Sequence, residues 1–111
     1  MELIRADGHP VCRCRVATSF GSRFLGLMGR AQLLPGNGLL LPGTSSVHTH
    51  FMRFPLDVVF LDSERRIVSI VKALRPWRLA RAKGADSVLE LAAGQCDRLG
   101  LTVGTALAEA S

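Results

Sequence analysis

The sequence is organised around Val47–Asp62, which reads VHTHFMRFPLDVVFLD. This stretch holds the densest apolar run in the chain and two of its three histidines. Val58–Leu61 is continuously apolar, rich in β-branched residues and bounded by Asp57 and Asp62, a pattern that indicates a strand buried on both faces. Pro55 lacks a backbone N–H and favours an extended residue before it, so we expect it to separate this strand from an earlier one.

The segment before the proline alternates in polarity. His48 and His50 would share one face of a strand over residues 47–52, because successive side chains of a strand point to opposite sides. Asp57 would then begin the buried strand beside a bend, with Arg53 four residues earlier. The stretch therefore combines a buried strand with charged and imidazole groups at its entrance.

Length and composition indicate a single globular domain spanning residues 1–111. A chain of 111 residues buries roughly 65% of its unfolded surface on folding, and a 48% hydrophobic content argues against disorder. The net charge of +5 favours acidic partners over basic ones. The chain has no run of five basic residues that could follow a phosphate backbone. It has a single Trp and no Tyr on which bases could stack, so its composition disfavours nucleic-acid binding.

Targeting and disulfide signals are absent from the sequence. No apolar run reaches the ~7–15 residues of a signal-peptide core or the ~18 residues of a membrane span. We therefore expect this form of the protein to be cytoplasmic and to have no membrane span. The three cysteines, Cys12, Cys14 and Cys96, are an odd number, which argues against a disulfide framework.

Turn and strand signals begin at the amino terminus. Asp7–Pro10 predicts a turn between strands at Glu2–Ala6 and Val11–Val16. In the second of these strands Cys12 and Cys14 fall on the same face and are expected to point inward.

An apolar stripe then predicts a helix from Thr18 to about Met28. A long loop is expected over residues 75–86, in which Trp77 follows a proline and is expected to anchor the loop. Further strands are expected at residues 39–41, 67–71, 88–91 and 105–108, and a second short helix at residues 92–99. About seven short strands with two short helices predict an α+β fold: a mainly antiparallel sheet, curled or closed into a small barrel.

Several motifs occur in an order that resembles the uncharacterised bacterial and archaeal family known as domain of unknown function 192. The resemblance extends from about residue 17 to residue 107. The matching blocks are Arg23-x-x-Gly26-Leu27-Met28, Met52-x-x-Pro55-Leu56-Asp57-Val58-Val59-Phe60-Leu61-Asp62, Val88-Leu89-Glu90-Leu91-x-x-Gly94 and Gly100-Leu101-x-x-Gly104.

The resemblance implies a compact, β-rich α+β fold with no established activity. Many members of the family carry an export signal or a lipid anchor, and we expect neither here. Thr105 stands where the family often has Asp, so no functional carboxylate is expected at that position. His50 stands where relatives usually have an apolar or aromatic residue, so any role of its side chain would be specific to a subgroup.

Charged residues around the buried strand suggest a binding site. Arg53 and Asp57 flank the bend, and His48, Arg30 and Arg75 are candidates to complete a pocket for a small anionic or sugar-like ligand that Asp57 orients. The alternative is a structural role, in which Asp57 pairs with an arginine and accepts backbone N–H bonds.

A catalytic role requires a further convergence of side chains. Glu90 interrupts an apolar strand, where it either faces solvent, pairs with an arginine or contributes to the ligand site. Asp57, Glu90 and His48 would supply an acid and a base if they met in one cavity. The chain has neither a complete phosphate-binding glycine loop nor a Gly-x-Ser-x-Gly motif, so we assign no catalytic residue.

Two groups of residues that are close in sequence have side chains that could bind a metal. His48 and His50 alternate on one expected strand, and His9 precedes Cys12 and Cys14. Neither cluster has the paired spacing of a zinc site. Free cysteines on an inward face are often small buried hydrophobes, so no metal and no cofactor is predicted.

Three functional hypotheses follow from these features. The first is a non-enzymatic module that binds a small polar or anionic ligand near Arg53 and Asp57. The second is a protein-interaction or accessory subunit that uses the cations of the long loop, which are Arg75, Arg78, Arg81 and Lys83. The third is a small enzyme, which requires the three acid–base groups named above to line one cavity.

Overall fold

The apolar run at the end of the organising stretch forms the central strand of the protein. In the computed structural model, which describes residues 1–17, 33–49 and 54–110, this strand is β5 (Leu56–Leu61), and all of its residues are buried. It lies between β6 (Ile67–Leu74) and β8 (Ser87–Ala92) and pairs with both in antiparallel fashion. The predicted strand buried on both faces is therefore confirmed.

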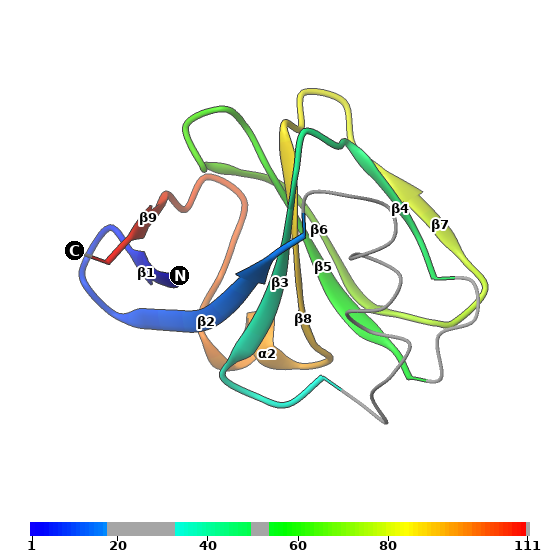
Figure 1. The fold of residues 1–111 in the computed structure, drawn as a ribbon, viewed down its shortest axis with the longest axis horizontal. Coiled ribbons are helices and arrows are strands. Elements are labelled where there is room, and N and C mark those ends of the chain that lie inside the picture. Colours follow the sequence, from blue (N-terminus) through cyan, green and yellow to red (C-terminus); the bar gives the residue numbers. More distant parts are fainter. Residues whose placement is uncertain (18–32, 50–53, 111) are drawn as a thin grey trace.

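Seven strands form one sheet in the order β6-β5-β8-β3-β2-β1-β9. Neighbouring strands are antiparallel except for β2 and β3, which are parallel. Figure 1 shows β3, β5 and β8 at the centre of the molecule, with β1 and β9 together at one end. The members not yet named are β1 (Glu2–Arg5), β2 (Pro10–Val16), β3 (Asn37–Pro42) and β9 (Leu107–Glu109).

The sheet is curled but is not closed into a barrel. In the described part of the chain, the residues immediately before the edge strands β6 and β9 are joined by one isolated bridge, between Arg66 and Ala106. Beside it, Leu107 N donates to Arg65 O at 2.9 Å. Because β9 has three residues and β6 has eight, β9 is too short to cover the whole edge of β6. Of the two predicted alternatives, the curled antiparallel sheet is therefore confirmed and the closed small barrel is wrong.

A two-stranded ribbon, formed by β4 (Ser46–His48) and β7 (Leu79–Arg81), lies beside the main sheet (Figure 1). Val47 and Ala80 are opposite each other in its register, and both are buried. His48 and Leu79 are the next opposed pair, and both are exposed. The ribbon therefore has one face in the core and one face toward solvent.

One of the two predicted helices falls within the described residues. In residues 1–17, 33–49 and 54–110 the only helix is α2 (Gln95–Arg98), within the predicted range 92–99. The helix predicted over residues 18–28 lies outside the described residues, so the expectation of two helices is tested only in part. Nowhere in the described chain is a helix long and apolar enough to cross a bilayer.

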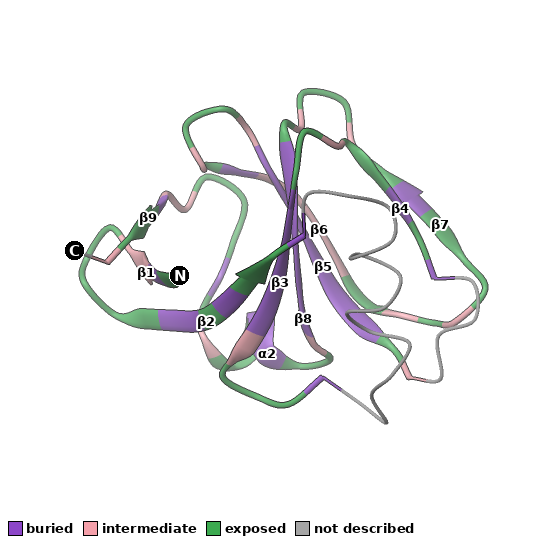
Figure 2. Cartoon of the chain, viewed as in Figure 1, coloured by how far each residue is buried: buried purple, intermediate pink, exposed green. Residues whose placement is uncertain are grey.

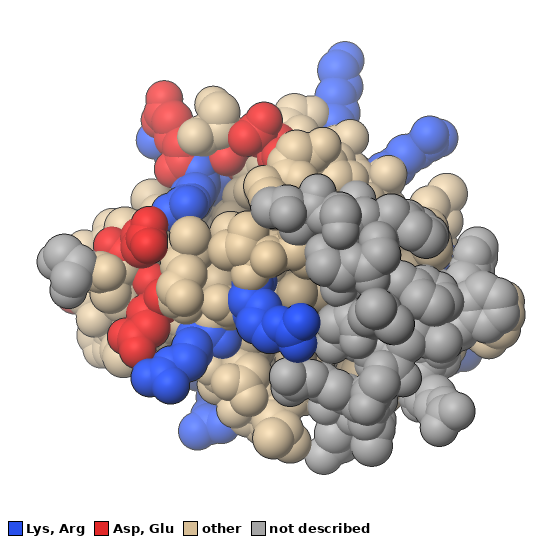
Figure 3. Space-filling view, in the orientation of Figure 1, with Lys and Arg blue, Asp and Glu red and all other residues tan. Residues whose placement is uncertain are grey.

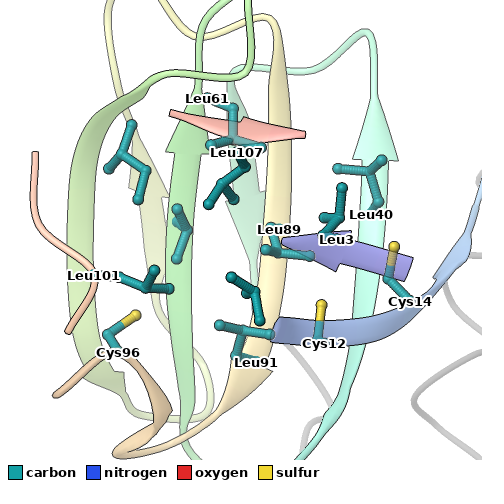
Figure 4. Close-up of a cluster of buried hydrophobic side chains, with 13 residues drawn as sticks. Leu3, Cys12, Cys14, Leu40, Leu61, Leu89, Leu91, Cys96, Leu101 and Leu107 are labelled. Carbon is teal, nitrogen blue, oxygen red and sulfur yellow. The ribbon is translucent and has the colours of Figure 1, made fainter. Parts of the chain in front are cut away.

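The buried residues concentrate on the central strands (Figure 2). Because successive side chains of β5 point to opposite faces of the sheet, the buried side chains form two clusters. Val59 and Leu61 point into the first, which we call the cysteine-side core because it contains all three cysteines (Figure 4). Val58 and Phe60 point into the second, which we call the ribbon-side core because it contains Val47 and Ala80 of the ribbon. Full burial stabilises each such side chain by about 1.5–3 kcal/mol.

One glycine makes close contact between β2 and β3 possible. A Cβ atom added at Gly38 would lie 3.0 Å from the Sγ of Cys12 and 3.1 Å from a methyl carbon of Leu91. Gly38 does not have a positive φ, so its importance lies in this contact and not in its backbone conformation. We expect Gly38→Ala to destabilise the fold by about 1–3 kcal/mol through overpacking.

Urea unfolding of Gly38→Ala measures this loss directly. The matched control is the same substitution in a Cys12→Ala background, where the crowding sulfur is gone and the loss should be smaller. An equal loss in both backgrounds would contradict the proposed contact between Gly38 and Cys12.

Candidate functional site

Asp57 lies on β5 with its side chain in the cysteine-side core, and it is 1% exposed. Its Oδ1 accepts a hydrogen bond from Ala73 N at 2.9 Å. Its Oδ2 accepts hydrogen bonds from Gly94 N at 3.1 Å and Cys96 N at 2.9 Å. Both carboxylate oxygens are therefore bound to the backbone of other segments.

The segments that donate to Asp57 need an external acceptor. Ala73 has a φ of 50°, and the register of β6 against β5 shifts nearby. Gly94 is the N-cap of α2, has a φ of 91° and provides no side chain to cap the helix. Asp57 supplies that missing acceptor from a neighbouring strand, and its negative charge is favourable at a helix amino terminus.

These contacts support the structural interpretation of Asp57. Three backbone donors occupy most of the hydrogen-bonding capacity of a carboxylate, which is about four lone pairs. No ion pair to Asp57 is present within the described ranges. The nearby Lys72 instead donates to Asp97 at 2.6 Å. The ligand-orienting role that we considered for Asp57 therefore has no support in these contacts.

Cys96 is the buried thiol beside this carboxylate. Burial raises the pKa of Cys96 to about 12, and the adjacent charge of Asp57 contributes to the rise. The thiol is therefore protonated at neutral pH, a state in which it is a poor nucleophile.

Glu90 lies on the opposite face of the sheet from Asp57. It is 4% exposed and is opposite Val58 and Leu39 in the strand registers, so its side chain belongs with the ribbon-side core. His48 is on the solvent face of the ribbon. Asp57, Glu90 and His48 therefore do not converge, and the acid–base hypothesis that required their convergence is wrong.

The remaining predicted site residues are distributed between the surface and the undescribed part of the chain. Arg75 is exposed in the segment between β6 and β7. Arg30, Arg53 and His50 lie outside the described residues, so the pocket predicted around Arg53 stays a prediction.

The amino-terminal ligand cluster does not form. His9 is exposed and its Nδ1 lies 3.1 Å from the Oδ1 of Asp7, whereas Cys12 and Cys14 are buried in the cysteine-side core. Across the described residues no three His, Cys, Asp or Glu side chains are grouped so that they could hold a metal ion.

A shallow hollow of about 340 Å³ lies between the β1–β2 turn and the segment that precedes β9. Its cation is Arg5, which donates to the Oδ1 of Asp7 at 3.1 Å and to Leu99 O at 2.8 Å. Because protein groups already occupy this guanidinium, the hollow offers little to an anionic ligand. Its lining residues are Arg5, Ala6, Asp7, Gly100, Thr105 and Ala106.

Thr49 fixes a turn that the sequence did not reveal. It is 1% exposed, and its Oγ1 donates to Arg75 O at 2.6 Å and accepts from Arg78 N at 2.8 Å. Its backbone N donates to Arg78 O at 2.8 Å, and its carbonyl oxygen accepts from Trp77 N at 2.9 Å. One buried threonine therefore holds the whole turn from residue 75 to residue 78.

The turn presents Trp77 in a strained conformation. Trp77 has a φ of 63° and is 56% exposed, although the left-handed region costs a bulky residue about 1–2 kcal/mol. Leu79, which follows closely, is 65% exposed. We expected Trp77 to anchor the loop, but Thr49 provides the anchor and Trp77 is largely on the surface.

Cations precede and follow these two apolar side chains along the chain. Residues 65–85 contain no Asp or Glu, and neither do residues 43–49. Figure 3 shows blue and red side chains interleaved over the end of the molecule near β1 and β9. We define the Trp77 surface as Trp77, Leu79, Arg75, Arg78, Arg81 and Lys83, all of which are exposed.

The role of Asp57 gives a direct stability prediction. Asp57→Asn places an amide nitrogen against backbone N–H donors and leaves at least one of them unsatisfied in the interior. We expect a loss of about 2–4 kcal/mol in the free energy of unfolding, measured by urea denaturation.

Asp62→Asn is the matched control. The Oδ1 of Asp62 alone accepts from Glu64 N at 2.8 Å and Arg66 N at 2.9 Å. An asparagine keeps that one oxygen, and the site is exposed, so we expect a loss below about 1 kcal/mol. Equal losses for the two variants would contradict the structural role of Asp57.

Solved structures share this fold. A protein of unknown function from Novosphingobium aromaticivorans aligns over 97% of this chain and 84% of its own chain, with a TM-score of 0.82 and 24% identity. A putative transcription regulator from Sinorhizobium meliloti aligns over 96% and 89%, with a TM-score of 0.82 and 30% identity.

Sequence comparison identifies the family. A UPF0127 protein of Pyrococcus furiosus is 36% identical over 100 residues, which are 84% of this chain and 83% of the relative. A UPF0127 protein of Thermococcus sibiricus is 36% identical over 97 residues, which are 83% of this chain but 62% of the longer relative. Residues 2–108 match DUF192, described as Uncharacterized ACR. The resemblance inferred from the motifs is therefore confirmed, and this chain belongs to the DUF192 family.

Proposed function

We propose that this protein is a non-enzymatic binding module that engages an acidic, partly apolar segment of another protein through the Trp77 surface. The observation that carries the proposal is the exposure of Trp77 in a left-handed turn that Thr49 holds with four hydrogen bonds. Strained residues persist where the surrounding structure determines them, and they often occur at ligand clamps.

The composition of the surface fits a protein partner. Trp and Arg are the residue types most enriched among those that dominate binding energies at protein interfaces. Trp77 and Leu79 provide exposed apolar groups, and the four cations, which are close to them along the chain and also exposed, provide the charge. The absence of acidic residues from residues 65–85 leaves these cations without local compensation, so an acidic segment would complement them.

The same chemistry fits nucleic acid less well. Single-stranded nucleic acids stack successive bases on several aromatic side chains, and Trp77 is the one large aromatic residue exposed in the described chain. The Sinorhizobium meliloti relative is described as a putative transcription regulator, so a nucleic acid belongs in the test as the competing partner.

The small-ligand hypothesis has weaker support. It placed Asp57 at the ligand, and the hydrogen bonds of Asp57 go to three backbone N–H groups instead. The Trp77 surface therefore supports a binding function better than the surroundings of Asp57.

Trp77 provides its own assay because it is the single tryptophan of the chain. Titration with an acidic peptide that alternates Glu and Leu should shift its fluorescence emission. Arg78→Glu with Arg81→Glu should weaken binding at least tenfold. The control is Arg13→Glu with Arg15→Glu, which changes the net charge equally at exposed positions of β2 and should have little effect.

Two results would contradict the proposal. Equal weakening by both pairs of substitutions would show that binding follows net charge alone. Tighter binding of a single-stranded oligonucleotide of equal charge would identify nucleic acid as the partner class. Thr49→Val tests the turn separately, because it removes the anchor of Trp77 without changing any charge and should also weaken peptide binding.

A further inference from the structure

The hydrogen bonds of the β4–β7 ribbon determine which backbone groups point out of it. At one end, Ala82 N donates to Ser45 O at 3.0 Å. At the other end, Thr49 N donates to Arg78 O at 2.8 Å. Bonded pairs occupy every second position of an antiparallel ladder, so the bonded β7 residue between these ends is Ala80. The N–H and C=O groups of the residues on either side of it therefore point away from β4.

The outer edge of β7 is open. It offers the N–H and C=O groups of Leu79 and Arg81, and in the described chain β7 pairs with β4 alone. Among the described residues none of these groups has a backbone hydrogen-bond partner. Both residues are exposed, and β7 lies on the outer side of the ribbon, at the margin of the molecule (Figure 1). A segment of another chain can therefore reach this edge.

The other edge of the ribbon is already occupied at Ser46. This residue of β4 is opposite Arg81, so its backbone groups point away from β7. The hydroxyl group of Thr44 accepts a hydrogen bond from Ser46 N at 3.4 Å and donates one to Ser46 O at 3.0 Å. A side chain of the protein thus takes the place of an added strand beside β4, and β7 is the edge that stays available.

The charges beside this edge select its occupant. Two copies of β7 paired edge to edge would bring Arg81 and the flanking Arg78 and Lys83 of both copies together, and like charges on paired strands are destabilising. Such charges are a common protection of edge strands against pairing between identical chains. An acidic strand has the opposite charge, so it is the complementary occupant.

We propose that the acidic segment binds as an added antiparallel β-strand on the outer edge of β7. This inference rests on the proposed function and specifies how the partner is held. Backbone hydrogen bonds to Leu79 and Arg81 supply affinity, and alternate side chains supply specificity, as in other cases of strand addition. Partner residues opposite these two bond through both of their backbone groups and have their side chains on the same face of the ribbon. Acidic residues at those positions therefore lie on the face of Arg81.

Backbone methylation of the peptide tests the proposal. The peptide that alternates Glu and Leu is made in two further forms, with N-methyl groups on every Glu or on every Leu. The two forms have equal charge, but only the first loses the N–H groups that face β7. Measured by Trp77 fluorescence, methylation at Glu should weaken binding about tenfold or more, and methylation at Leu should change it less than about twofold.

Arg81→Pro and Arg81→Ala provide a matched test on the protein. Both variants lose the cation, but only proline removes the N–H that points out of the ribbon, a position at which edge strands tolerate proline. Arg81→Pro should therefore bind the unmethylated peptide about fivefold or more weakly than Arg81→Ala does. Thermal unfolding checks that both variants fold, and the methylated peptides decide the matter if the proline variant does not.

The outcomes separate the mode of binding from the proposed function. If the unmethylated peptide binds and the two methylated forms are weakened equally, or neither is weakened, the added strand is overturned and the proposed function stands. Weakening by methylation at Leu alone would also overturn it, because the opposite set of backbone groups would then face β7. Equal binding by the two folded Arg81 variants would overturn it as well. Failure of the unmethylated peptide to bind would overturn the proposed function and this inference together.

Discussion

The fold depends on a buried carboxylate that joins three segments of backbone. A charge in a protein interior is costly unless hydrogen bonds replace the lost water. Asp57 accepts N–H bonds from the end of β6, from the residue that caps α2 and from α2 itself. These three hydrogen bonds offset the cost of burying the charge, and they join the end of β6 and the start of α2 to β5.

The alternating side chains of β5 support two different cores on the two faces of the sheet. One face of the strand supports a core that contains the three cysteines, and the other supports a core closed by the β4–β7 ribbon. Thr49 extends the buried face of the ribbon by one residue and turns the chain outward at Trp77. The exposed aromatic side chain is therefore tied to the core through a single hydroxyl group and its adjacent peptide groups.

Local patterns predicted local features well, and registers explain most of what they missed. The apolar run from Val58 to Leu61 was sufficient to place the central strand, because a strand buried on both faces has apolar side chains at consecutive positions. Whether Asp57 and Glu90 share a face depends on the pairing of β5 with β8, which no single segment encodes. Closure of the sheet likewise depends on the length of β9. The left-handed φ of Trp77 had no local signal, since bulky residues rarely adopt it.

The kink at Ala73 also limits growth of the sheet. β6 is an edge strand of eight residues, and long apolar edges can recruit strands from other molecules and seed aggregation. At Ala73, near the end of β6, the backbone turns to a φ of 50° and is held there by its hydrogen bond to Asp57, so a foreign strand cannot continue a regular ladder over the last two residues of β6. The carboxylate that fastens the fold from within thus also shortens the surface on which an intermolecular sheet could begin.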